Sequence, residues 1–119
     1  MSRVLVIDDE PDLRFMLRRV FELAGHEVAE AGDGAAAWAS VQQSRPDLVV
    51  TDLTMPVMGG VELIRRLRAE QTTAAIPILA VSGDSHLAVD ADAALAKPYA
   101  WKELIALAEG LLKEGRGHR

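Results

Sequence analysis

Acidic side chains, one hydroxyl and one lysine directly follow short apolar runs in this chain. The first run, VLVI, leads into Asp8 and Asp9, and a later one, LVV, leads to Asp52. Ser82 ends a further run, and Lys97 follows the last. Carboxylates, a hydroxyl and an ammonium are the groups that bind a hard divalent cation together with a phosphoryl group.

The carboxylates of such a set would repel one another. Two of them about 4 Å apart repel by about 4 kcal/mol at an effective dielectric constant near 20, and a magnesium ion relieves that repulsion. With the ion in place, Asp52 can attack a phosphoryl group whose other oxygens contact Lys97 and Ser82. One acid alone is more often a solvated loop group, so the hypothesis depends on the whole set.

The elements that must position this set alternate along the chain. Short apolar runs predict buried strands, and apolar residues at helical spacing predict helices between them. We expect strands near residues 4–7, 27–31, 48–52, 76–81 and 93–96, and helices over 11–24, 35–43, the stretch after 60, and 100–113. Strict alternation predicts an open parallel sheet covered on both faces, with ligands at the carboxyl ends of its strands.

Length and composition restrict the class of protein. The 119 residues are half apolar, which suits a single domain, expected here over 1–113 with a flexible C-terminal tail over 114–119. A formal charge of −5 argues against direct binding of nucleic acid or an anionic membrane. Without cysteine there is neither a disulfide framework nor a thiolate metal site. No signal peptide is visible and no apolar run is long enough to span a bilayer, so we expect a cytoplasmic protein.

Four segments carry a family resemblance. VLVIDDEPD, VVTDLTMPVMGG, AVSGD and LAKPY resemble, in this order, the signature segments of response-regulator receiver domains in two-component signalling, over about residues 3–113. The resemblance implies a flavodoxin-like open parallel five-stranded sheet in the order 2-1-3-4-5, with helices on both faces. The step from Lys97 to Pro98 resembles one that is typically cis in the family.

The resemblance also assigns roles to the candidate residues. Asp52 matches the phosphoacceptor, Lys97 the family's invariant lysine and Ser82 its serine or threonine. The implied cofactor is Mg²⁺, with ligands from Asp8, Asp9, Asp52 and the backbone carbonyl of Thr54. Such a domain is not an enzyme in the turnover sense, although it catalyses its own phosphorylation and dephosphorylation.

Partners follow from the same resemblance. The phosphodonor would be a phosphohistidine on a sensor histidine kinase or a histidine phosphotransfer protein, and the output a downstream protein target. Because no effector sequence follows, we expect the domain to act alone, as a monomer or weak dimer. Arg14, Arg18 and Arg19 could meet an acidic kinase surface, but a solvated helix face is the more common role of such residues.

Two departures from the family pattern bear on output. The switch position three residues before the lysine, usually Tyr or Phe in the family, is Ala94, so Tyr99 or Trp101 would have to take over part of its role. Only residues 83–92 connect the last two predicted strands, whereas a parallel crossover usually needs at least about 10–12 residues including its helix. We therefore expect the fourth helix to be short or absent, with at most one turn through His86–Val89.

Three other readings remain open. A haloacid-dehalogenase-like phosphatase would need a second Asp where Thr54 stands. A flavodoxin-like cofactor binder would need a first loop that attracts phosphate, whereas Asp8 and Asp9 repel it. The last alternative is a non-phosphorylated receiver-like interaction module, which the short crossover favours and the complete acceptor set disfavours.

Overall fold

The computed structural model describes residues 2–53, 55, 57–83 and 90–114 of the chain. Its strands are β1 (Arg3–Ile7), β2 (Glu27–Ala31), β3 (Leu48–Asp52), β4 (Ile78–Ser82) and β5 (Ala93–Ala96). Its helices are α1 (Pro11–Leu23), α2 (Gly34–Gln43), α3 (Gly60–Ala69) and α4 (Trp101–Glu114). The strands form one parallel sheet in the order β2-β1-β3-β4-β5, which confirms the predicted fold class.

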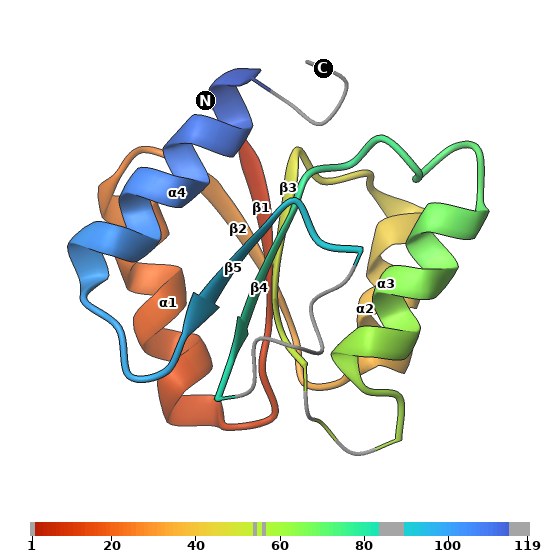
Figure 1. Cartoon of the computed structure of the whole chain (residues 1–119), viewed down its shortest axis with the longest axis horizontal. Coiled ribbons are helices and arrows are strands. Elements are labelled where there is room, and N and C mark those ends of the chain that lie inside the picture. The colour runs from red at the N-terminus through yellow and green to blue at the C-terminus, as the bar shows by residue number, and fades with distance from the viewer. Residues whose placement is uncertain (1, 54, 56, 84–89, 115–119) are drawn as a thin grey trace.

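The sheet separates two hydrophobic cores, and Figure 1 shows α1 and α4 on one side of it and α2 and α3 on the other. Successive strand residues point to opposite faces, so β1 supplies both cores. Val4 and Val6 pack with Phe21 of α1 and Leu104 of α4, while Leu5 and Ile7 belong to the core beneath α2 and α3. The middle of each central strand is therefore apolar, and its polar residues stand toward the ends.

Most element boundaries lie within one residue of those predicted, but β4 does not begin at Ile76. The Ile76 N–H donates to the Thr73 carbonyl at 3.1 Å in a turn, and Pro77 has no N–H to contribute to the sheet. The ladder between β3 and β4 therefore starts at Ile78, opposite Val49. At the other end of the chain, α4 runs to Glu114, and residues 115–119 of the predicted tail lie outside the described residues.

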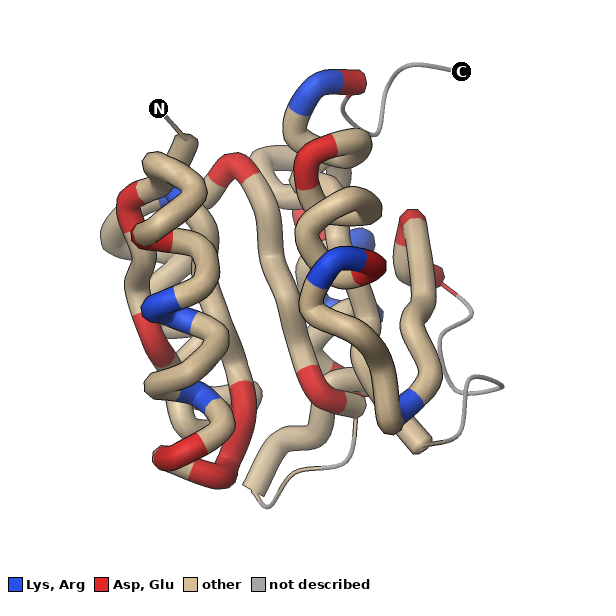
Figure 2. Tube along the Cα trace, turned by 90° about the vertical axis from the view of Figure 1, so that its left-hand side faces the viewer, with Lys and Arg blue, Asp and Glu red and all other residues tan. Residues whose placement is uncertain are grey.

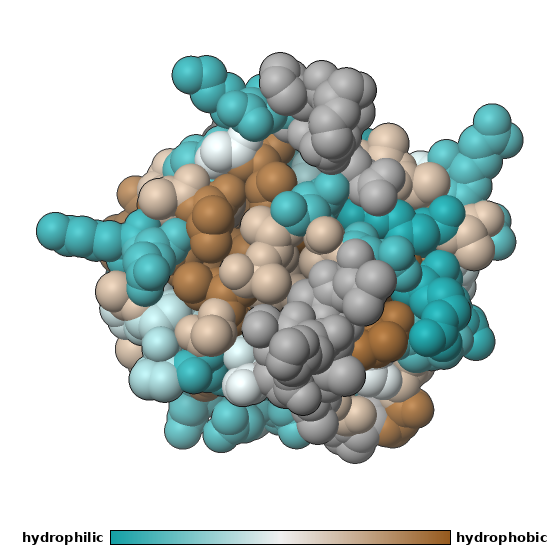
Figure 3. All heavy atoms as spheres, in the orientation of Figure 1, coloured by the Kyte–Doolittle hydropathy of each residue, from teal (hydrophilic) through white to brown (hydrophobic). Residues whose placement is uncertain are grey.

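The crossover from β4 to β5 contains no helix among its described residues, 83 and 90–92. The predicted turn through His86–Val89 lies outside the described residues. On β5, Ala93 and Leu95 pack toward α4, whereas Ala94 and Ala96 are exposed. Figure 3 shows hydrophobic residues gathered on the face that carries α4 and β5. None of the described helices combines the length and apolarity that crossing a bilayer requires.

A buried ion pair holds the end of this crossover. One Asp92 carboxylate oxygen accepts from Arg68 Nη2 and from the Ile78 N–H, each at 2.7 Å. Arg68 Nη1 donates in addition to the carbonyls of Ala74 and Ile76. The Asp92 side chain is 4% exposed and that of Arg68 12%. The pair thus joins the end of α3, the turn before β4 and the start of β5.

Replacing Asp92 with alanine is expected to lower the free energy of unfolding by about 3 kcal/mol, because a buried guanidinium and a backbone N–H lose their acceptor. Urea unfolding followed by circular dichroism measures this. Glu62→Gln is the matched control: Glu62 pairs with Arg65 and Arg66 in solvent, so its loss should cost less than about 0.5 kcal/mol. Equal urea midpoints for Asp92→Ala and Glu62→Gln would contradict a structural role for the buried pair.

Candidate functional site

The carboxyl ends of β1 and β3 bring three acids together. Asp8 and Asp9 follow β1, Asp52 ends β3, and one carboxylate oxygen from each lies within 4.8 Å of the others. Asp8 is buried, Asp52 is half-buried and Asp9 is exposed. Figure 2 shows acidic residues gathered at the bottom of the view, where β1 leads into α1.

Lys97 and Ser82 reach the same edge from β5 and β4. Lys97 Nζ lies 3.4 Å from Asp52 Oδ2, and its backbone N–H donates to the Ser82 carbonyl at 2.9 Å. Ser82 is buried and stands one residue beyond Val81, the register partner of Asp52. The peptide bond between Lys97 and Pro98 is cis, as the resemblance implied. Thr54, the remaining predicted ligand, lies outside the described residues.

The electrostatics around Asp8 favour a bound cation. Burial raises the pKa of the Asp8 carboxyl above its usual value, and the charges of Asp52 and Asp9 raise it further. Lys97 and the hydrogen bond from the Glu10 N–H, 2.9 Å from Asp8 Oδ1, act in the opposite direction. A buried carboxylate that shares one edge with two others needs either a proton or a cation. Three hard oxygen donors fit Mg²⁺.

Two glycines allow the segment after Asp52 to pack against its neighbours. A Cβ on Gly60 would lie 2.1 Å from the Asp52 carbonyl oxygen and 2.8 Å from Leu53 Cα. A Cβ on Gly34, at the start of α2, would lie 2.5 Å from the Met58 carbonyl oxygen, which accepts the Gly34 N–H at 2.8 Å. The sequence shows the glycines, but it does not show these approaches, because each involves backbone from another element.

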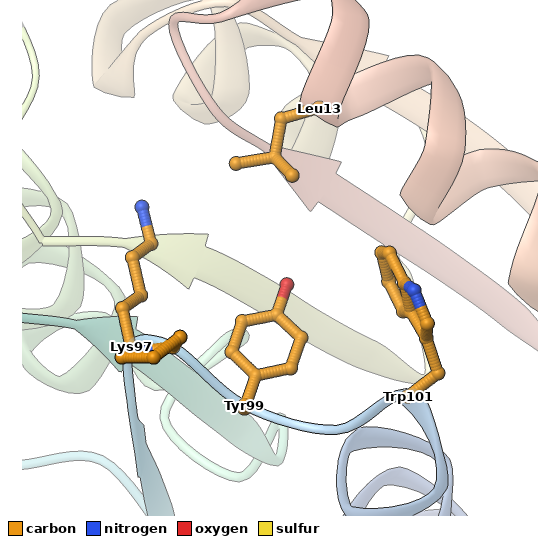
Figure 4. Close-up of a pocket in the computed structure, with 5 residues that line it drawn as sticks. Leu13, Lys97, Tyr99 and Trp101 are labelled. Atoms are coloured by element: carbon orange, nitrogen blue, oxygen red, sulfur yellow. The ribbon is translucent and has the colours of Figure 1, made fainter.

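A cavity of about 420 Å³ opens beside Lys97, lined by Leu13, Lys97, Pro98, Tyr99 and Trp101. In Figure 4 the Lys97 and Tyr99 side chains extend from the loop after β5 toward Leu13 of α1. The Tyr99 and Trp101 rings meet edge to face, with centroids 5.7 Å apart. Burial raises the pKa of the half-buried Tyr99 hydroxyl, and the charges of Asp8 and Asp52 add to this. Tyr99 therefore lies within electrostatic reach of the acids, while Ala94 is exposed on β5.

Comparison with known proteins identifies the family to which this sequence is similar. The family model described as the response regulator receiver domain matches residues 4–109. The transcriptional regulatory protein PrrA of Mycobacterium tuberculosis is 40% identical over 116 residues, covering 93% of this chain and 50% of that protein. The chain thus spans about half the length of the curated relatives it matches.

Solved structures agree with these sequence matches. The chemotaxis protein CheY4 of Vibrio cholerae superposes with a TM-score of 0.85 at 31% identity, covering 92% of this chain and 98% of that one. The response regulator TrrA of Thermotoga maritima, solved in complex with Mg²⁺–BeF, gives 0.85 at 28% identity, with coverages of 93% and 99%.

Gly60→Ala is expected to destabilise the chain by at least about 2 kcal/mol, because α3 must move away from the Asp52 carbonyl to admit the methyl group. Gly110→Ala is the control: Gly110 lies inside α4 with no atom within 4 Å of an added Cβ. Because alanine favours helix, this change should stabilise the chain by about 0.5–1 kcal/mol. Urea unfolding of the two variants should give shifts of opposite sign, and a neutral Gly60→Ala would refute the close approach.

Without divalent cations, Asp8→Asn is expected to stabilise the chain increasingly as the pH rises above about 4. Because the pKa of Asp8 is raised on folding above 3.8, the folded wild type retains a proton that the unfolded chain has lost. The free energy of unfolding of the wild type therefore falls as the pH rises from 3.8 through the higher pKa of the folded state. The asparagine variant has no such proton, so it does not lose stability in this way. Urea unfolding in EDTA between pH 4 and 8 measures the difference, and a pH-independent difference would contradict the raised pKa.

Proposed function

We propose that this chain, which belongs to the response regulator receiver domain family, accepts a phosphoryl group on Asp52 from a phosphohistidine donor. Phosphorylation would then switch a surface that binds a downstream protein. The observation that carries the proposal is the convergence of Asp52 with Lys97, at 3.4 Å, and with the carboxylates of Asp8 and Asp9.

The chain's own residues have distinct parts in the transfer. An Asp52 carboxylate oxygen forms the new bond to phosphorus as the donor's N–P bond breaks, and the electron pair of that bond stays on the imidazole nitrogen. Lys97, now beside Asp52 Oδ2, would pair with a phosphoryl oxygen, and Ser82 would donate to another. Mg²⁺, held by Asp8, Asp9 and Asp52, would neutralise charge on the phosphoryl oxygens.

This role is that of a phosphoacceptor rather than of an enzyme with turnover. The domain would catalyse its own phosphorylation and dephosphorylation through positioning and charge compensation. We propose a histidine kinase or a histidine phosphotransfer protein as donor, in the cytoplasm. Relatives such as PrrA are named as transcriptional regulators, and this chain matches half of that protein. With a net charge of −5, the receiver itself would bind a protein rather than nucleic acid.

Output would take a route different from the family's usual aromatic switch. Ala94 has no ring to move inward. Tyr99 is close enough to Asp8 and Asp52 for their charges to affect its hydroxyl, so it would respond to a change of charge at Asp52. The edge-to-face contact would pass a movement of Tyr99 to Trp101, the first residue of α4.

The remaining alternative is a receiver that acts as an interaction module without phosphorylation. Family membership argues against the phosphatase and the flavin-binding readings, but not against this one. It predicts the same fold and the same acid cluster with no stable modification of Asp52. Direct phosphorylation therefore separates the two.

Incubation with MgCl₂ and acetyl phosphate should add the mass of one phosphoryl group to the intact chain. Asp52→Ala should remove the modification, because no carboxylate remains at the end of β3 to attack. EDTA should prevent it in the wild type. Lys97→Met should slow it by about 10²-fold, as expected for the loss of one charged group that stabilises the transition state.

Lys102→Met is the matched control, since Lys102 is an exposed lysine of α4, and it should leave the rate unchanged. An unmodified wild type under these conditions, folded by circular dichroism, would favour the interaction module. Modification that persists in Asp52→Ala would show that another residue is the acceptor.

A further inference from the structure

We propose that Arg14 is a positioning residue for the metal-binding acids, because its guanidinium ties the backbone of Asp8 to β2. In this role Arg14 does not touch the ion or the phosphoryl group. It holds the loop from Asp8 to Glu10 in the shape that receives Mg²⁺. The inference depends on the proposed function and adds to it a residue outside the acid cluster.

The contacts of Arg14 join three elements. From α1, its Nη1 donates to the backbone carbonyl of Asp8 at 2.8 Å, and its Nε forms a 2.9 Å ion pair with Glu30 of β2. The two side chains are 21% and 25% exposed. The Arg14 guanidinium also lies close to the backbone of Gly32, where a Cβ would be 3.4 Å from Nη1, an ordinary contact distance. The solvated helix face expected from the sequence therefore describes Arg19, which is exposed, but not Arg14.

Glu30 is a fixed anchor for this contact. Its second carboxylate oxygen accepts from Arg18 Nη1 at 2.8 Å, and Arg18 is held in turn by Glu22 at 3.0 Å. Hydrogen bonds from Arg18 and Arg14 lower the pKa of Glu30, so it stays ionised at neutral pH. The backbone of Glu30 is also fixed, because Glu30 is paired with Val6 in the ladder between β1 and β2.

Asp8 is consequently attached on both sides of its backbone. Its N–H donates to the Ala31 carbonyl at 3.2 Å, and its C=O accepts from Arg14. Two further hydrogen bonds hold the loop from Asp8 to Glu10. The Glu10 N–H donates to Asp8 Oδ1 at 2.9 Å, and the Arg14 backbone N–H donates to the Glu10 carbonyl at 3.0 Å. Repulsion between the clustered carboxylates pushes this loop outward, and the Arg14 contact opposes that movement.

Positioning and simple charge predict opposite results for the loss of Arg14. A guanidinium near a cation site repels the cation, so Coulomb's law alone predicts tighter Mg²⁺ binding when Arg14 is removed. If Arg14 positions Asp8, its removal weakens Mg²⁺ binding by about 10–100-fold, the usual range for residues that orient metal ligands. The sign of the change therefore distinguishes the two roles.

The test is isothermal titration calorimetry of the full chain with MgCl₂ alone. The wild type is compared with Arg14→Met, Arg14→Lys and Arg18→Met. Arg14→Met should raise the Mg²⁺ dissociation constant about tenfold. Arg14→Lys should raise it several-fold, because an ammonium keeps the charge but cannot donate to the Asp8 carbonyl and to Glu30 in the geometry of a guanidinium. Arg18→Met is matched in charge and also removes a Glu30 contact, but it leaves the Asp8 carbonyl bonded and should change binding less than about twofold.

A second measurement excludes a merely structural effect. The rate of phosphorylation by acetyl phosphate is followed against Mg²⁺ concentration, at a temperature where circular dichroism shows each variant folded. In Arg14→Met the Mg²⁺ concentration for half-maximal rate should rise about tenfold, while the rate at saturation stays within about twofold. If Arg14→Met does not fold, Arg14→Lys and Glu30→Gln, which weakens the anchor by removing its charge, should show a smaller shift of the same kind.

Unchanged or tighter Mg²⁺ binding in Arg14→Met would overturn the inference alone, provided that the wild type binds Mg²⁺ and accepts phosphoryl groups. So would a wild-type Mg²⁺ dissociation constant in Arg14→Lys, since the paired contacts that only a guanidinium can make would then not be needed. A wild type that neither binds Mg²⁺ nor becomes phosphorylated would overturn the proposed function, and this inference with it.

Discussion

Mutual repulsion among Asp8, Asp9 and Asp52 is the interaction that the rest of the structure must oppose. Three carboxylates with oxygens within 4.8 Å of one another repel, and a bound cation would relieve that repulsion. The acids stay together because each stands at the end of a strand whose apolar residues are packed against helices on both faces of the sheet. Apolar packing in the two cores thus holds the carboxylates together at the edge of the sheet in spite of their repulsion, which a bound cation would reduce.

The elements and the site could be predicted from the sequence wherever the signal was local. Apolar runs placed β1, β3 and β4, the weaker β2 was predicted mainly from its context, and helical spacing with Pro11 and Gly25 placed α1. Acids, a serine and a lysine at the ends of those runs indicated the site from the sequence alone. The shared edge followed from parallel topology, because the carboxyl ends of all strands then point the same way. The strand order came from the family resemblance, since alternation alone does not set it.

Features that depend on pairs distant in the sequence could not be predicted. Arg68 has the helical position of a solvated arginine, yet it meets Asp92, 24 residues later, inside the protein. Arg14 likewise gave no local sign of its contact with Glu30, 16 residues away. A charged residue that is buried by its partner looks the same in a sequence as one that points into water. The predicted start of β4 was two residues too early for a related reason. Ile76 is as apolar as the strand residues, but its N–H bonds to the Thr73 carbonyl in a turn and not to a neighbouring strand.

The edge-to-face pair of Tyr99 and Trp101 gives the molecule an optical property. Trp101 stands at the mouth of the cavity beside Lys97, while Trp38, the other tryptophan, lies across the sheet with Arg66 over its ring at 5.9 Å. The two indoles therefore occupy unlike surroundings, one lining the cavity that contains Lys97 and one packed on the opposite side of the sheet. A ligand that alters the cavity beside Lys97 is therefore expected to change the emission of Trp101 more than that of Trp38. Unlabelled protein can in this way be followed in real time.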